Sequence, residues 1–77
     1  MIRLTSKGVG HVPQVPHNLA AWGAIKELLR VKALEGAVTT RKDVLEVLEY
    51  CGHWDKKFQP NTDYLTYALK MGWLTES

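Results

Sequence analysis

Apolar residues recur at helical spacing in three stretches of the chain. The first stretch is predicted to begin at Asn18, a good N-cap, and to run through Leu34 or Glu35 to Gly36, which suits the left-handed position after a helix. Its apolar residues are placed along one face: Trp22, Ile25, Leu28, Leu29 and Leu34. The charged residues fall largely elsewhere, so the pattern predicts an amphipathic helix that faces a core.

The second stretch opens with Thr40, Arg41, Lys42 and Asp43, a sequence typical of a capping box with Asp in place of the usual Glu. A helix should follow, ended by Gly52. Its buried face is predicted to consist of Val44, Leu45, Val47, Leu48 and Cys51. A polar connection from His53 to Pro60 then separates this helix from the next, and it is long for a turn between helices.

The third helix is predicted to be capped by Asn61 or Thr62 and stopped by Gly72. Its apolar residues stand at i, i+3 and i+4, namely Leu65, Ala68 and Leu69. With the two preceding helices, it predicts a mainly α domain of three helices, occupying residues 18–77.

Short strands are predicted outside the helices. Ile2 and Leu4 alternate with polar neighbours, while Ala37 to Thr39 and Trp73 to Thr75 are short candidates later in the chain. Ser6 to His17 contains two glycines and two prolines, so it is expected to run as a flexible, extended arm. Residues 1–17 are therefore treated as a strand and arm that precede the helical domain.

Length and composition limit the class of protein. The 77 residues fit a single domain, and a hydrophobic fraction of 45% is enough for one core. The single cysteine, Cys51, favours a reducing compartment and hence a cytoplasmic location. No apolar run approaches the roughly 18 residues of a membrane span. Ten Lys and Arg against eight Asp and Glu give a net charge of +2, which permits a polyanionic partner.

The order of these elements resembles the winged helix-turn-helix domains of transcription regulators. The resemblance covers Asn18 to Thr75, and its most telling piece is Tyr64 to Leu74, similar to a recognition helix that runs through a glycine into the first strand of a wing. It implies a winged-helix-like fold and duplex DNA as the partner. Two features depart from the family: the connection before the third helix is longer, and no wing hairpin is completed. Pairing of the Ile2 to Leu4 strand with Trp73 to Thr75 would replace the missing strand.

If the third helix enters a major groove, four residues are expected to reach base edges, and Lys70 a phosphate. The four are Asn61, Thr62, Thr66 and Tyr67. Asp63, on the same face, opposes this interpretation because it would repel phosphate, and an ordinary solvated face is the alternative.

Two further basic pairs are candidate phosphate contacts. Arg41 and Lys42 stand in the first turn of their helix, where the helix dipole disfavours positive charge, so a partner is a reason for their position. Lys56 and Lys57 lie between the aromatic residues Trp54 and Phe58. The alternative is that these rings anchor a loop to the core while the lysines stay in water.

No metal, cofactor or catalytic set is expected. Cys51, His53 and Asp55, with His11 and His17 upstream, lack the paired spacing of a zinc site. No nucleophile adjoins a base, and no phosphate-binding glycine loop is present, so an enzyme is not expected.

The sequence thus predicts a small cytoplasmic regulator that occupies duplex DNA, with its oligomeric state open. The alternative is a small protein-binding inhibitor or adaptor of the phage or mobile-element type. Such a module would use aromatic residues as interface anchors: Trp54, Phe58, Tyr64, Tyr67 and Trp73.

Overall fold

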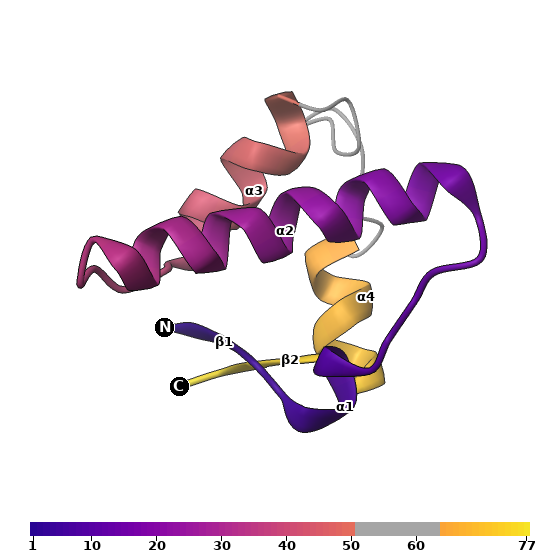
Figure 1. Ribbon diagram of the computed structural model, residues 1–77, viewed down its shortest axis with the longest axis horizontal. Coiled ribbons are helices and arrows are strands. Elements are labelled where there is room, and N and C mark those ends of the chain that lie inside the picture. The colour runs from indigo at the N-terminus through magenta and orange to yellow at the C-terminus, as the bar shows by residue number, and fades with distance from the viewer. Residues whose placement is uncertain (51–63) are drawn as a thin grey trace.

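The computed structural model describes residues 1–50 and 64–77. In chain order the elements are β1 (Ile2–Leu4), α1 (Ser6–Val9), α2 (Pro16–Leu34), α3 (Arg41–Tyr50), α4 (Tyr64–Met71) and β2 (Leu74–Glu76). Figure 1 shows α2 crossing the molecule with α4 running roughly across it and the two strands below. The described part is mainly helical, with a small sheet made by the two ends of the chain, as predicted.

Helix α2 begins earlier than the sequence indicated. Pro16 occupies its first turn and Val15 is the N-cap residue, without a side-chain cap, so the start at Asn18 was wrong. Proline is favoured at the first helical position because its missing N–H has no partner there in any helix. At the other end Gly36 has φ +70°, which confirms the predicted left-handed position after the helix.

Helix α3 begins with the predicted capping box. The Asp43 backbone N–H donates to Thr40 Oγ1 at 3.2 Å, and the Thr40 N–H donates back to Asp43 Oδ2 at 3.0 Å. Two of the backbone donors that a helix start leaves unpaired are thereby satisfied within four residues. Val44 and Leu48 are buried, as predicted, and Leu45 packs against the core. Cys51, Gly52 and the His53 to Pro60 connection lie outside the described residues.

Helix α4 and the strand after it follow the predicted pattern closely. Leu65 and Ala68 are buried, and Gly72 has φ +80°, the conformation expected of a glycine helix stop. The predicted caps Asn61 and Thr62 lie outside the described residues. Strand β2 begins at Leu74, one residue later than predicted, because Trp73 is still bonded to α4 through its N–H and the Ala68 carbonyl.

The sheet joins the two ends of the chain, which confirms the predicted pairing. β1 and β2 are antiparallel, with Ile2 opposite Glu76 and Leu4 opposite Leu74. The segment predicted as a strand at Ala37 to Thr39 is not one, although the Ile2 N–H donates to the Thr39 carbonyl at 2.7 Å. This hydrogen bond alone does not make a ladder, and the turn at Gly36 and the cap at Thr40 fix both ends of the segment.

The expectation of an extended arm was wrong for Ser6–Val9, which forms the single-turn helix α1. Thr5 is its N-cap, since Thr5 Oγ1 accepts the Gly8 N–H at 3.0 Å. The turn lies directly against the start of β2: a Cβ atom built on Gly8 would stand 2.1 Å from the Trp73 carbonyl oxygen. Only glycine allows this approach of two backbones.

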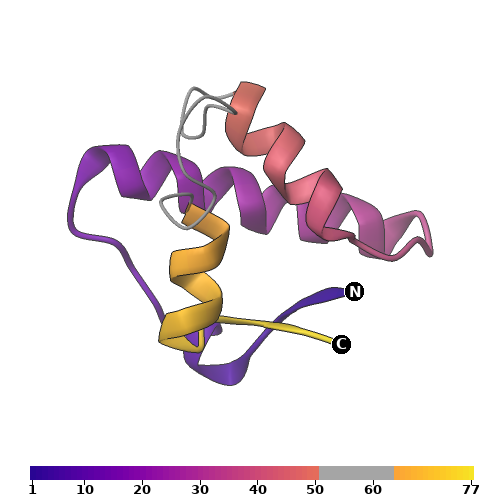
Figure 2. The same cartoon turned by 180° about the vertical axis from the view of Figure 1, so that it is seen from behind.

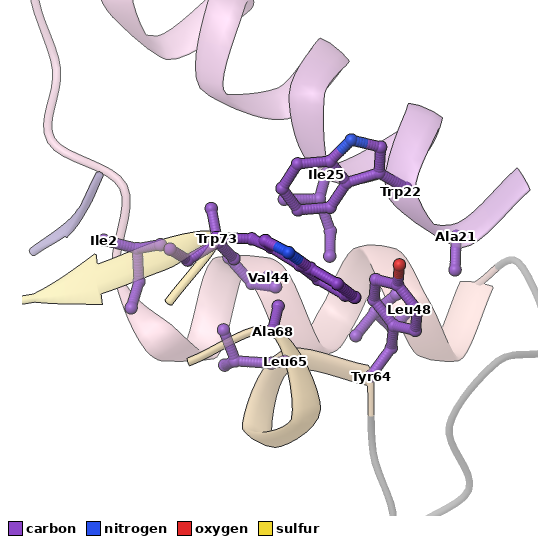
Figure 3. Packing of buried hydrophobic residues seen from close by; sticks show 11 residues of the cluster. Ile2, Ala21, Trp22, Ile25, Val44, Leu48, Tyr64, Leu65, Ala68 and Trp73 are labelled. Carbon is purple, nitrogen blue, oxygen red and sulfur yellow. The ribbon is translucent and has the colours of Figure 1, made fainter. Parts of the chain in front are cut away.

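One hydrophobic cluster draws residues from β1, α2, α3, α4 and β2 (Figure 3). Its largest fully buried side chains include Trp22, Ile25, Leu48 and Leu65. Leu34 was predicted to share the core face of α2, but it is 75% exposed. It follows Ile25 by nine positions, and at roughly 100° per residue that places it half a turn away from the core.

Candidate nucleic-acid interface

Helix α4 is held by its inner face and exposes its outer face. Tyr64, Leu65 and Ala68 are buried against the core, whereas Tyr67 is 45% exposed and Lys70 is exposed. Thr66 is half-buried. The predicted division of this helix into a core face and a solvent face is therefore present, and the described helix contains no acidic residue. Asp63, which would oppose a phosphate, lies outside the described residues.

An aromatic cluster fixes the position of α4. The Trp73 ring, 8% exposed, makes an edge contact with Trp22 of α2 at 6.1 Å between centroids and another with Tyr67 at 5.3 Å. Tyr67 also meets Tyr64 edge-on at 6.0 Å. Burial raises the pKa of the Tyr64 hydroxyl, and the nearby Tyr67 raises it further, so Tyr64 stays neutral near pH 7. Tyr67 is thus a positioned side chain, half in the cluster and half in solvent.

His11 belongs to this aromatic cluster. Its ring stacks on Trp73 at 3.5 Å between centroids with the planes 14° apart, and it meets Trp22 edge-on at 5.4 Å. The sequence offered His11 only as a remote member of an improbable zinc set. Cys51, His53 and Asp55 lie outside the described residues, and among the residues that are described no three potential ligands gather around one point.

Lys7 is a candidate residue that the sequence reasoning missed. It stands in the last turn of α1, and its Cδ atom lies 3.9 Å from the point that a Cβ on Gly72 would occupy. Because Gly72 directly follows α4, the Lys7 side chain lies beside the end of the helix that carries Lys70. Only the contact between distant parts of the chain brings these two lysines to the same end of α4.

Arg41 and Lys42 lie elsewhere on the molecule. Arg41 donates to Glu76, the last residue of β2, at 2.8 Å, and this hydrogen bond holds the pKa of the Glu76 carboxyl below its usual value. Lys70, in contrast, stands just before the other end of β2. The pairing with Glu76 gives Arg41 a structural reason for its place in the first turn of α3. Lys42 is exposed.

An open groove of about 350 Å³ lies between α2 and α3. Lys32 and Asp43 form an ion pair across it, with Nζ and Oδ2 3.7 Å apart. Its remaining lining residues are Leu28, Glu46, Val47 and Tyr50. The groove mixes apolar and charged walls and offers no nucleophile beside a base.

Lys56, Lys57, Asn61 and Thr62 lie outside the described residues. Of the nine residues predicted to touch DNA, the structure therefore describes five: Thr66, Tyr67 and Lys70 on α4, and Arg41 and Lys42 at the start of α3.

Comparison of the chain with known protein families, with curated proteins and with solved structures found no match. Within the described residues, no helix combines the length and the apolar character needed to cross a bilayer.

Proposed function

We propose that the protein is a small regulator that binds duplex DNA through the outer face of α4. The observation that carries the proposal is the outer face itself, where Tyr67 and Lys70 are exposed on a helix without an acidic residue. A helix fits the major groove of B-DNA, and side chains on its exposed face reach base edges there. The sequence from Tyr64 to Leu74 is similar to a recognition helix that runs through a glycine into a strand, and this similarity also supports duplex DNA as the partner.

The roles within the interface follow from position and chemistry. Lys70 and Lys7, at the same end of α4, contact phosphates as mobile cations. Thr66 and Tyr67 read base edges. Lys56 and Lys57 remain additional phosphate contacts by their sequence pattern. Arg41 serves chiefly to tie α3 to β2 through Glu76, and Lys42 beside it lies away from α4, so it is a phosphate contact only if the DNA extends beyond the α4 face. The two strands pair without forming a hairpin, so no wing contact is included. The protein would act in the cytoplasm by occupying its site, without catalysis or a metal.

Salt dependence of binding tests this assignment. If three to five cations meet phosphates, log affinity should fall against log salt with a slope of roughly −3 to −4.5. Lys70→Ala and Lys7→Ala should each make that slope shallower by about 0.9. Lys26→Ala, an exposed lysine on α2, is the matched control and should leave the slope unchanged. A slope near zero for the parent chain would exclude binding through phosphates.

Sequence preference is a separate arm of the same experiment. Thr66→Ala and Tyr67→Ala should alter the ranking of duplex sequences more than the salt slope, because base-edge contacts carry the specificity. Equal loss of affinity for every duplex, in both variants, would show that α4 positions the protein without reading bases.

A protein partner is the second candidate, and one observation favours it. Val9, Val12 and Val15, spaced three positions apart along the connection from α1 to α2, are 67%, 67% and 53% exposed, and exposed apolar side chains are available as anchors for a protein partner. Two of the anchors proposed from the sequence, Tyr64 and Trp73, are buried in the core instead. A protein partner would therefore bind through the valines, and Val12→Asp would weaken that complex while leaving DNA binding intact.

A further inference from the structure

Helix α2 carries apolar side chains on both of its sides. Trp22 and Ile25 fill the core, but Leu34 and Leu19 on the opposite side are 75% and 51% exposed. In Figure 1, α2 lies in front of α3 and α4, and Figure 2 shows those two helices in front when the molecule is turned around. The outer side of α2 is thus uncovered by the rest of the described chain.

The centre of this outer side holds one acid and one base. Glu27 and Arg30 are paired with each other through two hydrogen bonds, and their side chains remain 60% and 59% exposed. The outer face of α2 is defined here as Leu19, Gly23, Glu27, Arg30 and Leu34. These five residues carry one negative and one positive charge, and the exposed Lys26 stands at the edge of the face beside Leu19. A partner fits this face if it places a positive charge opposite Glu27 and a negative charge opposite Arg30, with an apolar side chain beyond them.

A second copy of the chain carries this arrangement. The point midway between residues 28 and 29 is 1.5 positions from both Glu27 and Arg30, and 5.5 positions from both Gly23 and Leu34. When two copies of a helix pack antiparallel about a two-fold axis at this point, Glu27 faces the other copy's Arg30, and each Leu34 faces the other copy's Gly23.

The space at Gly23 completes the match. A Cβ added at Gly23 would meet nothing within 4 Å, so the backbone of α2 is open to solvent there. A bulky Leu34 from a second copy would fit over this bare stretch, and the glycine would let the helix axes approach to about 8–10 Å. Leu34 is exposed to water in the single chain, and dimer formation would bury its side chain.

We propose that the protein forms a symmetric dimer through the outer face of α2, with the two α2 helices antiparallel. Because each copy contributes only one helix of 19 residues, we expect the contact to bury less than the roughly 1,200 Å² of a stable interface, so the association should be weak and reversible. This inference does not depend on the DNA-binding proposal, because it uses another helix.

A charge-exchange experiment tests it. In Glu27→Arg, positions 27 and 30 both carry positive charges, and in Arg30→Glu both carry negative charges. Like charges would then face each other across the two-fold axis, so each variant alone should dimerise roughly ten-fold more weakly or worse. An equimolar mixture of the two variants should restore association, since the two faces then complement each other. Both side chains are exposed, so neither change disturbs the core.

Sedimentation velocity at concentrations up to about 1 mM, chosen for a weak interface, is the measurement. The parent chain should shift from monomer toward dimer mass, and Gly23→Leu, which fills the space for Leu34, should reduce the shift. Glu46→Arg on α3 is the control and should behave like the parent. A parent that remains monomeric, or variants that dimerise as the parent does, or a mixture that fails to recover, would each overturn the proposal.

Discussion

Thr5 and Thr40 both cap a helix, but they join very different parts of the chain. Thr40 exchanges hydrogen bonds with Asp43, three residues away. Thr5 caps α1 through Gly8, and its hydroxyl also donates to the Gly72 carbonyl at 2.5 Å, 67 positions along the chain. The Thr40 junction is a local start signal, whereas the Thr5 junction ties the first residues to the end of α4 and to Trp73. The two junctions should therefore differ in how much stability they hold.

The largest effect is expected at Trp73. Its ring is buried and contacts residues of α2 and α4, so Trp73→Ala should cost about 3–5 kcal/mol and unfold much of so small a domain. Denaturant unfolding followed by circular dichroism would measure it. A variant as stable as the parent would show that the ring does not hold the Thr5 junction together.

The second effect is expected at Gly8, where the chain approaches the Trp73 carbonyl. Gly8→Ala places a Cβ against the Trp73 carbonyl oxygen, which cannot move without losing the hydrogen bonds that the Thr5 N–H and hydroxyl donate to it, and should cost about 2–3 kcal/mol. Gly10→Ala is the matched control, because a Cβ there meets nothing within 4 Å. If both alanine variants unfold at the same denaturant concentration, the close contact between α1 and β2 is not a constraint on the fold.

Removing the Thr5 hydroxyl should have a smaller effect. Thr5→Val keeps the shape but leaves the Gly8 N–H and the Gly72 carbonyl without this partner, at a cost of about 1–2 kcal/mol, since the site is only half-buried. Hydrogen exchange would localise the change. The amides of α1 and β2 should exchange faster together, while uniform acceleration across α3 as well would contradict a specific role of Thr5.

The smallest effect is expected at the Thr40 junction. Thr40→Ala removes one cap of an exposed helix start and should cost about 1 kcal/mol. A loss equal to that of Trp73→Ala would reverse the proposed ranking of the two junctions.

The Thr40 junction should also respond to acid. The backbone N–H of Thr40, its hydroxyl and Lys32 all lower the pKa of the Asp43 carboxyl. A lowered folded-state pKa stabilises the protein above the ordinary aspartate pKa of about 3.9, and this stabilisation is lost as the pH falls further. Asp43→Asn should therefore be less stable than the parent at pH 7, and the difference should shrink as the pH falls below the ordinary aspartate pKa of about 3.9. A difference that stays constant with pH would contradict the carboxylate's role.

The two junctions also explain what the sequence could predict. Thr40, Asp43 and Gly36 act within a few residues of themselves, so the start of α3 and the end of α2 were predicted correctly. Helix α1 was missed because its stability depends on the contact of Gly8 with Trp73, which no local pattern encodes. Leu34 was misplaced because apolar residues occur on both sides of α2, so the pattern did not single out one face.

The candidate interface divides in the same way. Thr66, Tyr67 and Lys70 were predicted from the spacing within one helix, and the structure gives them partly or well exposed positions on α4. Lys7 was not predicted, since only the packing of α1 beside Gly72 brings it to that helix. Arg41 was interpreted as a phosphate contact because of its place in α3, and its partner Glu76 was not visible from the sequence, 35 positions away.

The central claim, that α4 presents a DNA-binding face, is tested most directly by NMR of the labelled protein in low salt with increasing duplex DNA. We predict that the amides of Thr66, Tyr67 and Lys70 shift progressively, with Lys7 following because it lies beside the end of α4. The amides of Glu27 and Arg30, on the outer face of α2, should not respond to DNA. If saturating DNA moves no amide of α4, duplex DNA is not the ligand of this face and the claim is wrong.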